Sequence, residues 1–310
     1  MLKTEQRLLT KIARMYYIQD FTQQEIAKHF GLSRQKVNRM IKRAKEFGIV
    51  RISIANNDHL FTLEHEAESK LNVEEVWAVP SSSDNLPVEM GRVASEVLLR
   101  QVHSNSLIGI SWGTTLANIV PWMQDRKPEL KNITLIPLNG GVSRSVSPTG
   151  AGQLLEAVGF AMNASIYHLP VPAVVDSAEV SKQLYQERSV RDVMSLVKKI
   201  DIAVFSIGIP GPNSILHLSG YLSAEEFEVL IQERGAVGDI CSRYFNSQGE
   251  IAWPELDERT IGISIEDLKK IPRKICVAYG KHKSSAIKTA IHSGYINTLV
   301  ADTDLIETIL

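Results

Sequence analysis

The first 55 residues carry apolar positions at a helical spacing that is interrupted twice. This pattern predicts helices over residues 4–18, 22–29 and 34–46. The sequence GIVRISI at 48–54 then alternates apolar and polar positions, as a short strand or wing does. The pattern therefore predicts a small, mostly helical unit at the start of the chain.

The second and third predicted helices have the spacing of a helix-turn-helix motif. A small residue, a turn glycine and an apolar contact residue occupy the required places: Ala27, Gly31 and Val37. Thr22 and Glu25 have the reciprocal spacing of a capping box, and Ser33 can accept the free N–H groups that open the next helix. Both helix starts are thus marked in the sequence.

Polar and basic residues fill the first turns of the helix expected at 34–46. A helix-turn-helix protein presents these turns to base edges in the major groove of DNA. Arg pairs well with guanine, and Asn or Gln pairs well with adenine. Cations in the later turns of the helix are suited to phosphate contacts. We expect DNA contacts from Ser33, Arg34, Gln35, Lys36, Asn38, Arg39, Lys42 and Arg43. The alternative is an ordinary amphipathic helix pair with a solvated basic face.

The formal net charge of −1 conceals an asymmetry along the chain. Residues 1–55 contain 12 Lys and Arg against 4 Asp and Glu, giving +8, and residues 56–310 contain 22 against 31, giving −9. A basic region binds polyanions, while an acidic one is repelled by them. The charge therefore predicts a DNA-binding domain over 1–55 and a separate domain over 56–310 that does not lie along DNA. We expect the latter to be an effector-binding and oligomerisation domain. Residues 56–75 are the expected coupling segment.

Apolar runs alternate with amphipathic helices from Val76 onward. The runs are VWAV, SLIGIS, ITLIPL, SIYHLPV, DIAVFSIGI, AVGDICSRYF, RTIGIS, KICVAYG and TLVAD. The helices are expected at 88–102, 115–123, 151–164, 224–233 and 283–292. This order predicts an α/β fold with a mostly parallel sheet covered by helices, in which ligands bind at the carboxyl ends of strands.

Glycines and small polar residues follow several of these runs. The candidates for an effector site are Gly113, Thr114 and Thr115 in GISWGTT, and Asn139, Gly140 and Arg144 in PLNGGVSRS. Backbone N–H groups and hydroxyls at the first turn can hold a phosphate, although a tight turn with Thr as an ordinary cap gives the same pattern. The loop SIGIPGPNS at 206–214 is either a pocket loop or a simple connection.

Two charged residues complete the candidate site. Asp239 follows an apolar run, so its carboxylate is either an acceptor for a ligand hydroxyl or a structural cap. Lys283 begins a predicted helix, where a cation opposes the helix dipole unless an anion compensates it; the alternative is a solvated surface lysine. Together with the GISWGTT turn, these residues supply phosphate donors and a hydroxyl acceptor, which is the chemistry of a sugar phosphate.

Hydrophobic content and cysteine context limit the kind of protein that this chain can be. A hydrophobic content of 44% supports real cores, and the sequence has no apolar run long enough to span a membrane. The two cysteines, Cys241 and Cys276, lie in apolar contexts without neighbours at metal-binding spacing, so we expect them to be buried and reduced. We expect no metal, no cofactor and a cytoplasmic location.

The ordered motifs resemble those of the SorC family of bacterial sugar-responsive transcriptional regulators. They span essentially the whole chain: TQQEIAKHFGLSRQKVNRMIKRAKEFGIVRI, GISWGTT, LNGG, VGDICSRYF, NSQGE, RTIGIS and AYGKHKSSAIKTAIHSGYINTLVAD. The resemblance implies a helix-turn-helix domain joined to a domain similar to ribose-5-phosphate isomerase and glucosamine-6-phosphate deaminase. It also implies a homotetramer and a phosphorylated sugar effector, whose phosphate contacts Gly113, Thr114, Thr115 and Lys283. Asp239, Asn139, Gly140 and Arg144 would then face the sugar.

The chain departs from the family pattern at two places. Residues 137–150 contain no lysine that could hold an effector as an imine, and Tyr279-Gly280-Lys281 stands where a glycine pair is expected before Lys283. Three other functions stay open: isomerase or deaminase activity with Asp239 as base, an oligomerisation scaffold without effector, or a sugar-isomerase domain of another fold. We expect a non-enzymatic regulator that binds double-stranded operator DNA as a homodimer or homotetramer.

Overall fold

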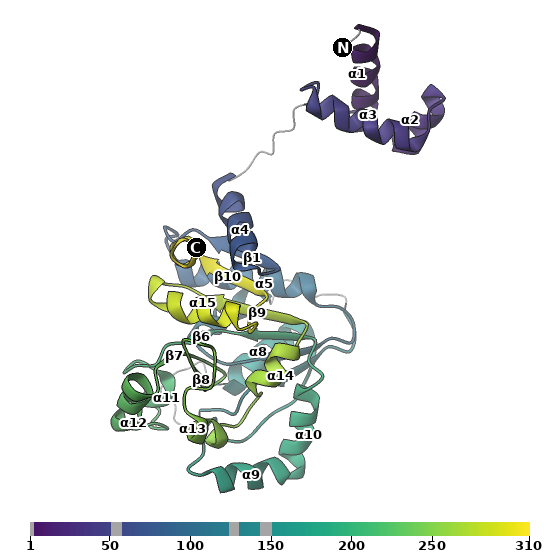
Figure 1. Ribbon diagram of the computed structural model, residues 1–310. Helices are drawn as coiled ribbons and strands as arrows, with labels where there is room; N and C mark the ends of the chain where they lie inside the picture. Colours follow the sequence, from purple (N-terminus) through teal and green to yellow (C-terminus); the bar gives the residue numbers. More distant parts are fainter. Residues whose placement is uncertain (1–2, 51–57, 124–129, 143–150) are drawn as a thin grey trace. The chain divides into compact units, whose positions relative to one another are not determined.

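The computed structural model describes residues 3–50, 58–123, 130–142 and 151–310 of the chain. These residues belong to two compact units, Met1–Asn57 and Asp58–Leu310 (Figure 1). The division lies two residues beyond the boundary that the charge asymmetry predicts. Each unit has a hydrophobic core of its own.

Within residues 3–50, the first unit contains three helices: α1 (Lys3–Tyr17), α2 (Gln23–Phe30) and α3 (Arg34–Glu46). Their ends agree with the predicted helices to within one residue. Apolar side chains from all three helices, including Leu9, Ile26 and Val37, are fully buried between them. The wing was expected at 48–54; Gly48–Val50 form a turn and a bend, and 51–54 lie outside the described residues.

The second unit is built on a seven-stranded parallel sheet, as the α/β prediction requires. Its strands, in spatial order, are β1 (Glu75–Val79), β10 (Thr298–Asp302), β9 (Arg273–Ala278), β5 (Ile202–Phe205), β2 (Leu107–Ile110), β3 (Thr134–Pro137) and β4 (Ser165–Ile166). Each strand pairs in parallel with its neighbours. The central strands are apolar on both faces because both faces are covered.

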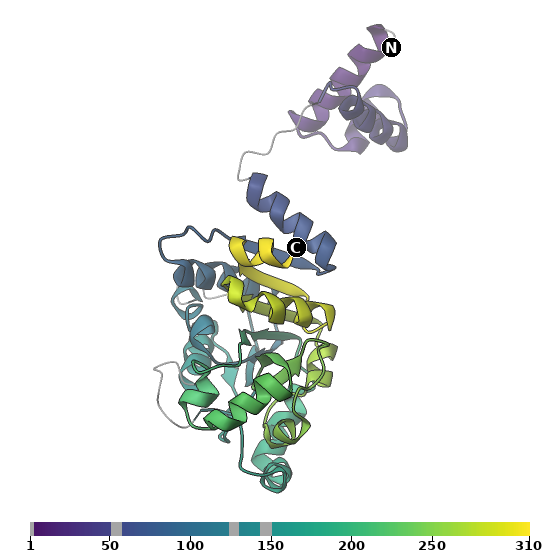
Figure 2. The same ribbon diagram turned by 60° about the vertical axis from the view of Figure 1, so that its left-hand side comes forward.

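Helices cover the sheet on both sides (Figure 2). One face packs α5 (Leu86–Gln101) and α8 (Ala151–Met162) against residues such as Ile202 and Val204. The other packs α4, α10, α14, α15 and α16 against the alternate residues, such as Ala203 and Phe205. The bounds of these helices are α4 Asp58–Leu71, α10 Arg188–Val197, α14 Ile265–Lys270, α15 Ser284–His292 and α16 Thr303–Ile309. None of the helices in the described ranges is long and apolar enough to cross a membrane.

A second, three-stranded antiparallel sheet corrects part of the strand prediction. It contains β6 (Ile207–Gly208), β7 (Ala236–Ile240) and β8 (Arg243–Asn246). The run AVGDICSRYF is therefore a hairpin and not a strand of the parallel sheet, because Cys241 and Ser242 turn the chain with φ values of 53° and 71°. The run DIAVFSIGI divides at Ser206, so that β5 joins one sheet and β6 the other.

Three other predicted elements differ from those in the structure. The run RTIGIS is not a strand; Thr260 and Gly262 make isolated bridges to Val174 and Asn139. The helix expected at 115–123 is two short helices, α6 (Thr114–Ala117) and α7 (Val120–Met123). The helix expected at 224–233 is α12 (Ala224–Glu228) continued by a π-helical turn, Val229–Glu233. Three further helices complete the unit: α9 (Ala178–Gln186), α11 (Ile215–Leu218) and α13 (Pro254–Arg259).

Helix α4 protects one edge of the parallel sheet. Strand β1 is an edge strand, so its outer N–H groups need partners from outside the sheet. Glu64 accepts a hydrogen bond from the Ala78 N–H at 2.8 Å, and Glu68 accepts one from the Val76 N–H at 3.0 Å. Burial in this position raises the pKa of Glu64. The predicted coupling segment 56–75 thus contains a helix fixed to the sheet by side-chain-to-backbone bonds.

Candidate functional site

The helix starts of the first unit have the caps that the sequence predicts. Thr22 accepts from the Glu25 N–H at 3.3 Å, and the Glu25 carboxylate accepts from the Thr22 N–H at 2.8 Å. The Thr22 hydroxyl also donates to this carboxylate at 2.7 Å, and the bonds from the hydroxyl and the N–H of Thr22 lower the pKa of Glu25. Gly31 ends α2 in the left-handed conformation (φ 64°, ψ 33°), and Ser33 accepts from the Lys36 N–H at 3.2 Å. The turn between the two helices is therefore specified by its own residues.

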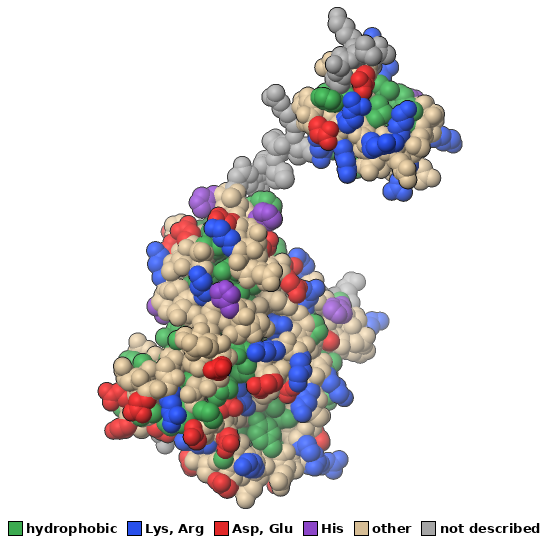
Figure 3. Space-filling view, viewed as in Figure 1, with side chains coloured by type: hydrophobic (Ala, Val, Ile, Leu, Met, Phe, Trp, Pro, Cys, Tyr) green, Lys and Arg blue, Asp and Glu red, His purple; other side chains and the backbone are tan. Residues whose placement is uncertain are grey.

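The residues predicted to contact DNA share one exposed surface of α3 and its cap. All of them are exposed: Ser33, Arg34, Gln35, Lys36, Asn38, Arg39, Lys42 and Arg43. Val37, Met40, Ile41 and Ala44, on the opposite side of the helix, are buried against α1 and α2. Figure 3 shows Lys and Arg side chains gathered on the visible surface of this unit. Arg43 differs from the others, because it forms an ion pair with Glu5 at 2.8 Å.

A cavity of about 450 Å³ lies at the carboxyl ends of the central parallel strands of the second unit. Its walls come from the segments that follow β2, β3, β5 and β9, together with the turn between β7 and β8. This is the place where α/β proteins bind ligands. Six of the eight predicted effector residues line it: Gly113, Thr114, Thr115, Asn139, Asp239 and Lys283.

The two remaining predicted residues are placed differently. Gly140 is not part of the cavity wall; its carbonyl accepts a hydrogen bond from Trp112 Nε1 at 2.8 Å. A Cβ atom there would lie 2.4 Å from the Pro172 carbonyl oxygen, so the glycine permits close packing of two loops. Arg144 lies outside the described residues.

The GISWGTT turn begins α6 without a capping side chain. Gly113 is the N-cap residue, with φ 146° and no side-chain hydrogen bond to the helix. Thr115 is buried and Thr114 is exposed. The alternative interpretation of these threonines as ordinary caps is therefore wrong. The first turn instead borders the cavity with backbone and hydroxyl groups.

Asp239 lies in the cavity wall on β7, next to the tight turn of the hairpin. Its carboxylate accepts from the Ser242 N–H at 3.1 Å, so it also stabilises that turn. Burial raises its pKa to about 6, although the Ser242 N–H and the Lys283 ammonium oppose the rise. Gly208 makes room for it, since a Cβ atom there would lie 2.1 Å from Oδ1 of Asp239. Both roles considered for Asp239 are thus compatible with its position.

Lys283 is half-buried at the end of the 3₁₀ turn Lys281–Lys283, directly before α15. Its ammonium group donates to the Ile207 carbonyl at 2.8 Å and lines the cavity. Burial lowers its pKa, against the effect of Cys276 and Asp239. It is therefore not the solvated surface lysine of the alternative interpretation. Gly280, with φ 94°, allows the loop before it to turn.

Asn139 lines the cavity, and its side chain also makes hydrogen bonds within the protein. It is 2% exposed, and its side chain joins two neighbouring segments. Its Oδ1 atom accepts from the Ser111 hydroxyl at 3.2 Å, and its Nδ2 atom donates to the Ser242 hydroxyl at 3.3 Å. Asn139 therefore fixes the base of the cavity by connecting the ends of β2 and β3 with the hairpin turn.

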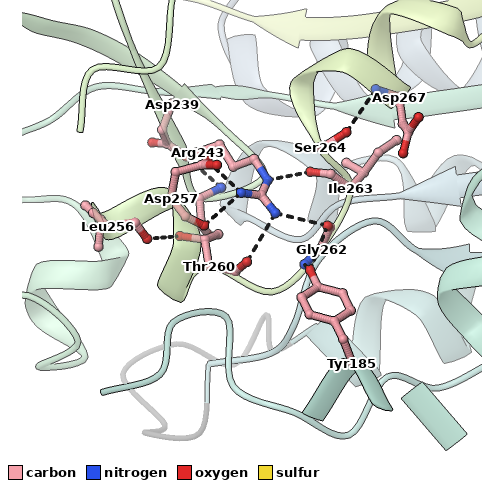
Figure 4. A network of polar contacts seen from close by, with 11 residues as sticks. Tyr185, Asp239, Arg243, Leu256, Asp257, Thr260, Gly262, Ile263, Ser264 and Asp267 are labelled. Carbon is pink, nitrogen blue, oxygen red and sulfur yellow. Dashed lines mark hydrogen bonds and ion pairs between the residues drawn. The ribbon is translucent and has the colours of Figure 1, made fainter. Parts of the chain in front are cut away.

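Arg243 supports the cavity and was not singled out from the sequence. It is 6% exposed and donates to five oxygen atoms of the segment 257–263 (Figure 4). The carboxylate of Asp257 lies 2.6 Å from Nη1, and Tyr185 joins the same segment through the backbone of Gly262. Because Gly262 bridges Asn139, this network holds the base of the cavity. In the sequence, the sign of this supporting role is the place of Arg243 within the apolar run AVGDICSRYF.

The two cysteines are free and buried, as expected. Cys241 also forms part of the cavity wall, and burial raises the pKa of its thiol to about 12. Among the described residues, no group of three His, Cys, Asp or Glu side chains is placed to hold a metal ion. From the described residues, the cavity is lined by hydroxyls, backbone groups, the His282 side chain, one carboxylate and one ammonium group.

The chain is similar to known regulators along nearly its whole length. The family described as "Putative sugar-binding domain" matches residues 55–310, and the family "Sigma-70, region 4" matches residues 14–47. The deoxyribonucleoside regulator of Bacillus subtilis is 31% identical over 97% of this chain and 96% of its own length. The sorbitol operon regulator of Klebsiella pneumoniae is 30% identical over 98% of both chains.

The fold agrees with these sequence similarities. The crystal structure of the full-length Klebsiella pneumoniae sorbitol operon regulator, SorC, superposes with a TM-score of 0.74 at 27% identity. It covers 98% of this chain and 99% of that one. The match therefore spans both units of this chain. The chain belongs to the SorC family of sugar-binding transcriptional regulators.

Proposed function

We propose that a phosphorylated sugar binds the cavity of the second unit and thereby changes the affinity of α3 for operator DNA. The observation that carries this proposal is the position of Lys283, whose half-buried ammonium group faces the same cavity as the uncapped first turn of α6. An ammonium group and free backbone N–H groups together suit a phosphate. A sugar without phosphate would offer these donors no anionic group.

The same cavity also contains a hydrogen-bond acceptor. The Asp239 carboxylate can accept hydrogen bonds from sugar hydroxyls, which is a common mode of polyol recognition. The hydroxyl of Ser206 also borders the cavity and has no hydrogen-bond partner among the described residues. A buried hydroxyl without a partner gains stability when a ligand supplies one. The cavity thus holds both cationic donors and hydroxyl acceptors, and suits a ligand that carries both a phosphate and hydroxyls.

Control of DNA binding requires that the ligand favour one arrangement of the reading helices over another, typically by about 1 to 3 kcal/mol. Helix α4 is the element through which this preference would act, because it follows the first unit in the chain and is fixed to β1 by Glu64 and Glu68. We propose that the chain acts in the cytoplasm as a homodimer or homotetramer, since paired reading helices suit palindromic operators.

We propose that the protein is not an enzyme. One observation favours a retained isomerase or deaminase activity: a carboxylate with a pKa of about 6, such as that of Asp239, is suited to general base catalysis. The similar proteins are named as regulators. Turnover of a sugar phosphate that disappears in Asp239→Asn would support the enzymatic alternative.

The test is operator binding by the full chain, with DNA from upstream of its own gene, at fixed salt and with a panel of sugar phosphates. We expect one compound to change the affinity, and Lys283→Ala to abolish that response without changing basal DNA binding. Lys281→Ala is the matched control, because Lys281 lies in the same turn but pairs with Asp304 on the surface. If both variants respond like the wild type, Lys283 is not the phosphate ligand.

A further inference from the structure

A second hollow in the molecule lies entirely within the first unit, between α1 and α3. Its volume is about 910 Å³. We name it the α1–α3 groove; its lining residues are Glu5, Arg7, Leu8, Lys11, Phe30, Lys36, Arg39, Met40 and Arg43. Five of the nine are basic and one is acidic, so the groove is strongly positive. The sequence analysis assigns no DNA contact to α1.

The basic residues of the groove form two facing rows. On α1, Arg7 and Lys11 are four residues apart and therefore lie one above the other on the same side of the helix. On α3, Lys36, Arg39 and Arg43 follow each other at the same helical spacing. The apolar lining residues Leu8, Phe30 and Met40 are buried or partly buried, whereas the five cations are exposed. Two rows of exposed cations on either side of a trough suit an extended polyanion.

We propose that the α1–α3 groove seats the sugar-phosphate backbone of the operator, so that α1 is a DNA-contacting helix. Lys36 and Arg39 belong both to the groove and to the exposed reading surface of α3. DNA whose bases face that surface therefore brings a phosphate strand alongside the groove. This inference rests on the proposed DNA-reading role of α3 and adds Arg7 and Lys11 as phosphate ligands.

Within the groove, the Glu5 carboxylate competes with phosphate for Arg43. It is the one carboxylate that lines the groove, and it lies 2.8 Å from the Arg43 guanidinium. A phosphate that approaches Arg43 must replace this carboxylate and is repelled by it. Glu5 therefore weakens binding to every DNA sequence alike, which limits non-specific binding while leaving base recognition by α3 unchanged.

The experiment measures binding of the full chain to the preferred upstream duplex and to an unrelated duplex of equal length, over a series of salt concentrations. We expect Arg7→Gln and Lys11→Gln each to weaken both duplexes by a similar factor, and to reduce the slope of log K against log salt by about 0.9 per lost contact. Glu5→Gln should strengthen both, by roughly two- to five-fold, since one phosphate repulsion is removed.

Lys45→Gln is the matched control, because it removes the same charge from α3 on a side where Lys45 lies 5.6 Å from the Tyr17 ring and outside the groove. Its salt slope should stay close to that of the wild type. If Arg7→Gln and Lys11→Gln keep the wild-type slope, or change it no more than Lys45→Gln, the groove does not bind phosphate. If Arg34→Gln also leaves the preference between duplexes unchanged, the reading role of α3 fails as well. Unchanged melting temperatures of these surface variants exclude misfolding.

Discussion

Asp239 is buried in the wall of the cavity, and its burial makes the stability of the free protein depend on pH. Burial raises the pKa of its carboxyl from 3.8 to about 6. Since the folded protein holds this proton more tightly than the unfolded chain, Asp239 stabilises the fold at low pH. That contribution is lost as the pH rises through 6.

The size of the effect follows from the shift. Each pKa unit corresponds to about 1.4 kcal/mol, so keeping the charged carboxylate in its folded surroundings costs about 3 kcal/mol at pH 8. Near pH 5 roughly half of this cost remains, because the folded carboxyl is already protonated while the unfolded one is mostly ionised. The uncharged Asp239→Asn retains an oxygen that can accept from the Ser242 N–H. This variant should therefore be more stable than the wild type at pH 8, by an amount that falls as the pH decreases.

The assay is urea unfolding of wild type and Asp239→Asn without ligand, at intervals from pH 5 to pH 8. The ligand is omitted because a phosphate also titrates near pH 6. Glu258→Gln serves as the control, since Glu258 is exposed and loses the same charge. A stability difference between wild type and Asp239→Asn that is constant over this range would refute the reasoning. So would a wild type that is the more stable of the two at pH 8.

Three further predictions concern stability. Arg243→Met leaves the Asp257 carboxylate and several carbonyls without their donor. It should therefore lower the free energy of unfolding of the second unit by about 3 kcal/mol, measured by urea-induced unfolding. Ser33→Ala removes the cap of α3 and should cost the first unit about 1 kcal/mol, measured by its thermal unfolding. Glu64→Ala deprives the Ala78 N–H of its acceptor and should destabilise the second unit by about 1 to 2 kcal/mol, whereas Glu64→Gln, which keeps an acceptor, should not.

Each of these has an outcome that contradicts it. An Arg243→Met protein as stable as the wild type would mean that the 257–263 segment holds its place by packing alone. Equal melting of Ser33→Ala and wild type would assign the start of α3 to its burial instead of its cap. Equal effects of Glu64→Ala and Glu64→Gln would attribute the loss to charge and not to the hydrogen bond.

The helices, turns and most strands can be predicted from the sequence because they depend on residues close together in the chain. Thr22, Glu25, Gly31 and Ser33 specify the helix-turn-helix through caps and one left-handed residue, all within a few positions of each other. Parallel strands covered on both faces produce uninterrupted apolar runs, so most strands of the large sheet were predicted at their places. The rule that ligands bind at strand ends then predicted the region of the cavity.

The remaining features depend on contacts between distant segments. The β7–β8 hairpin turns at Cys241 and Ser242, which have positive φ values without the glycine or asparagine that marks such a turn. Arg243 is held by a segment that begins fourteen residues later, at Asp257, and no periodicity reveals such a partner. Likewise, the commitment of Asn139 to Ser111 and Ser242 exists only when three segments meet.

The pairing of β1 with β10 has a consequence for how the protein is made. Strand β1 comes early in the second unit, but its neighbour in the sheet is β10, at residues 298–302, close to the end of the chain. On the ribosome, the three-helix unit can fold early, because its contacts are local, whereas the edge on which α4 rests forms only after the last strand has emerged. A prematurely terminated product would keep α3 and lack the strand that pairs with β1. On the function proposed above, we expect such a fragment to bind DNA without responding to an effector.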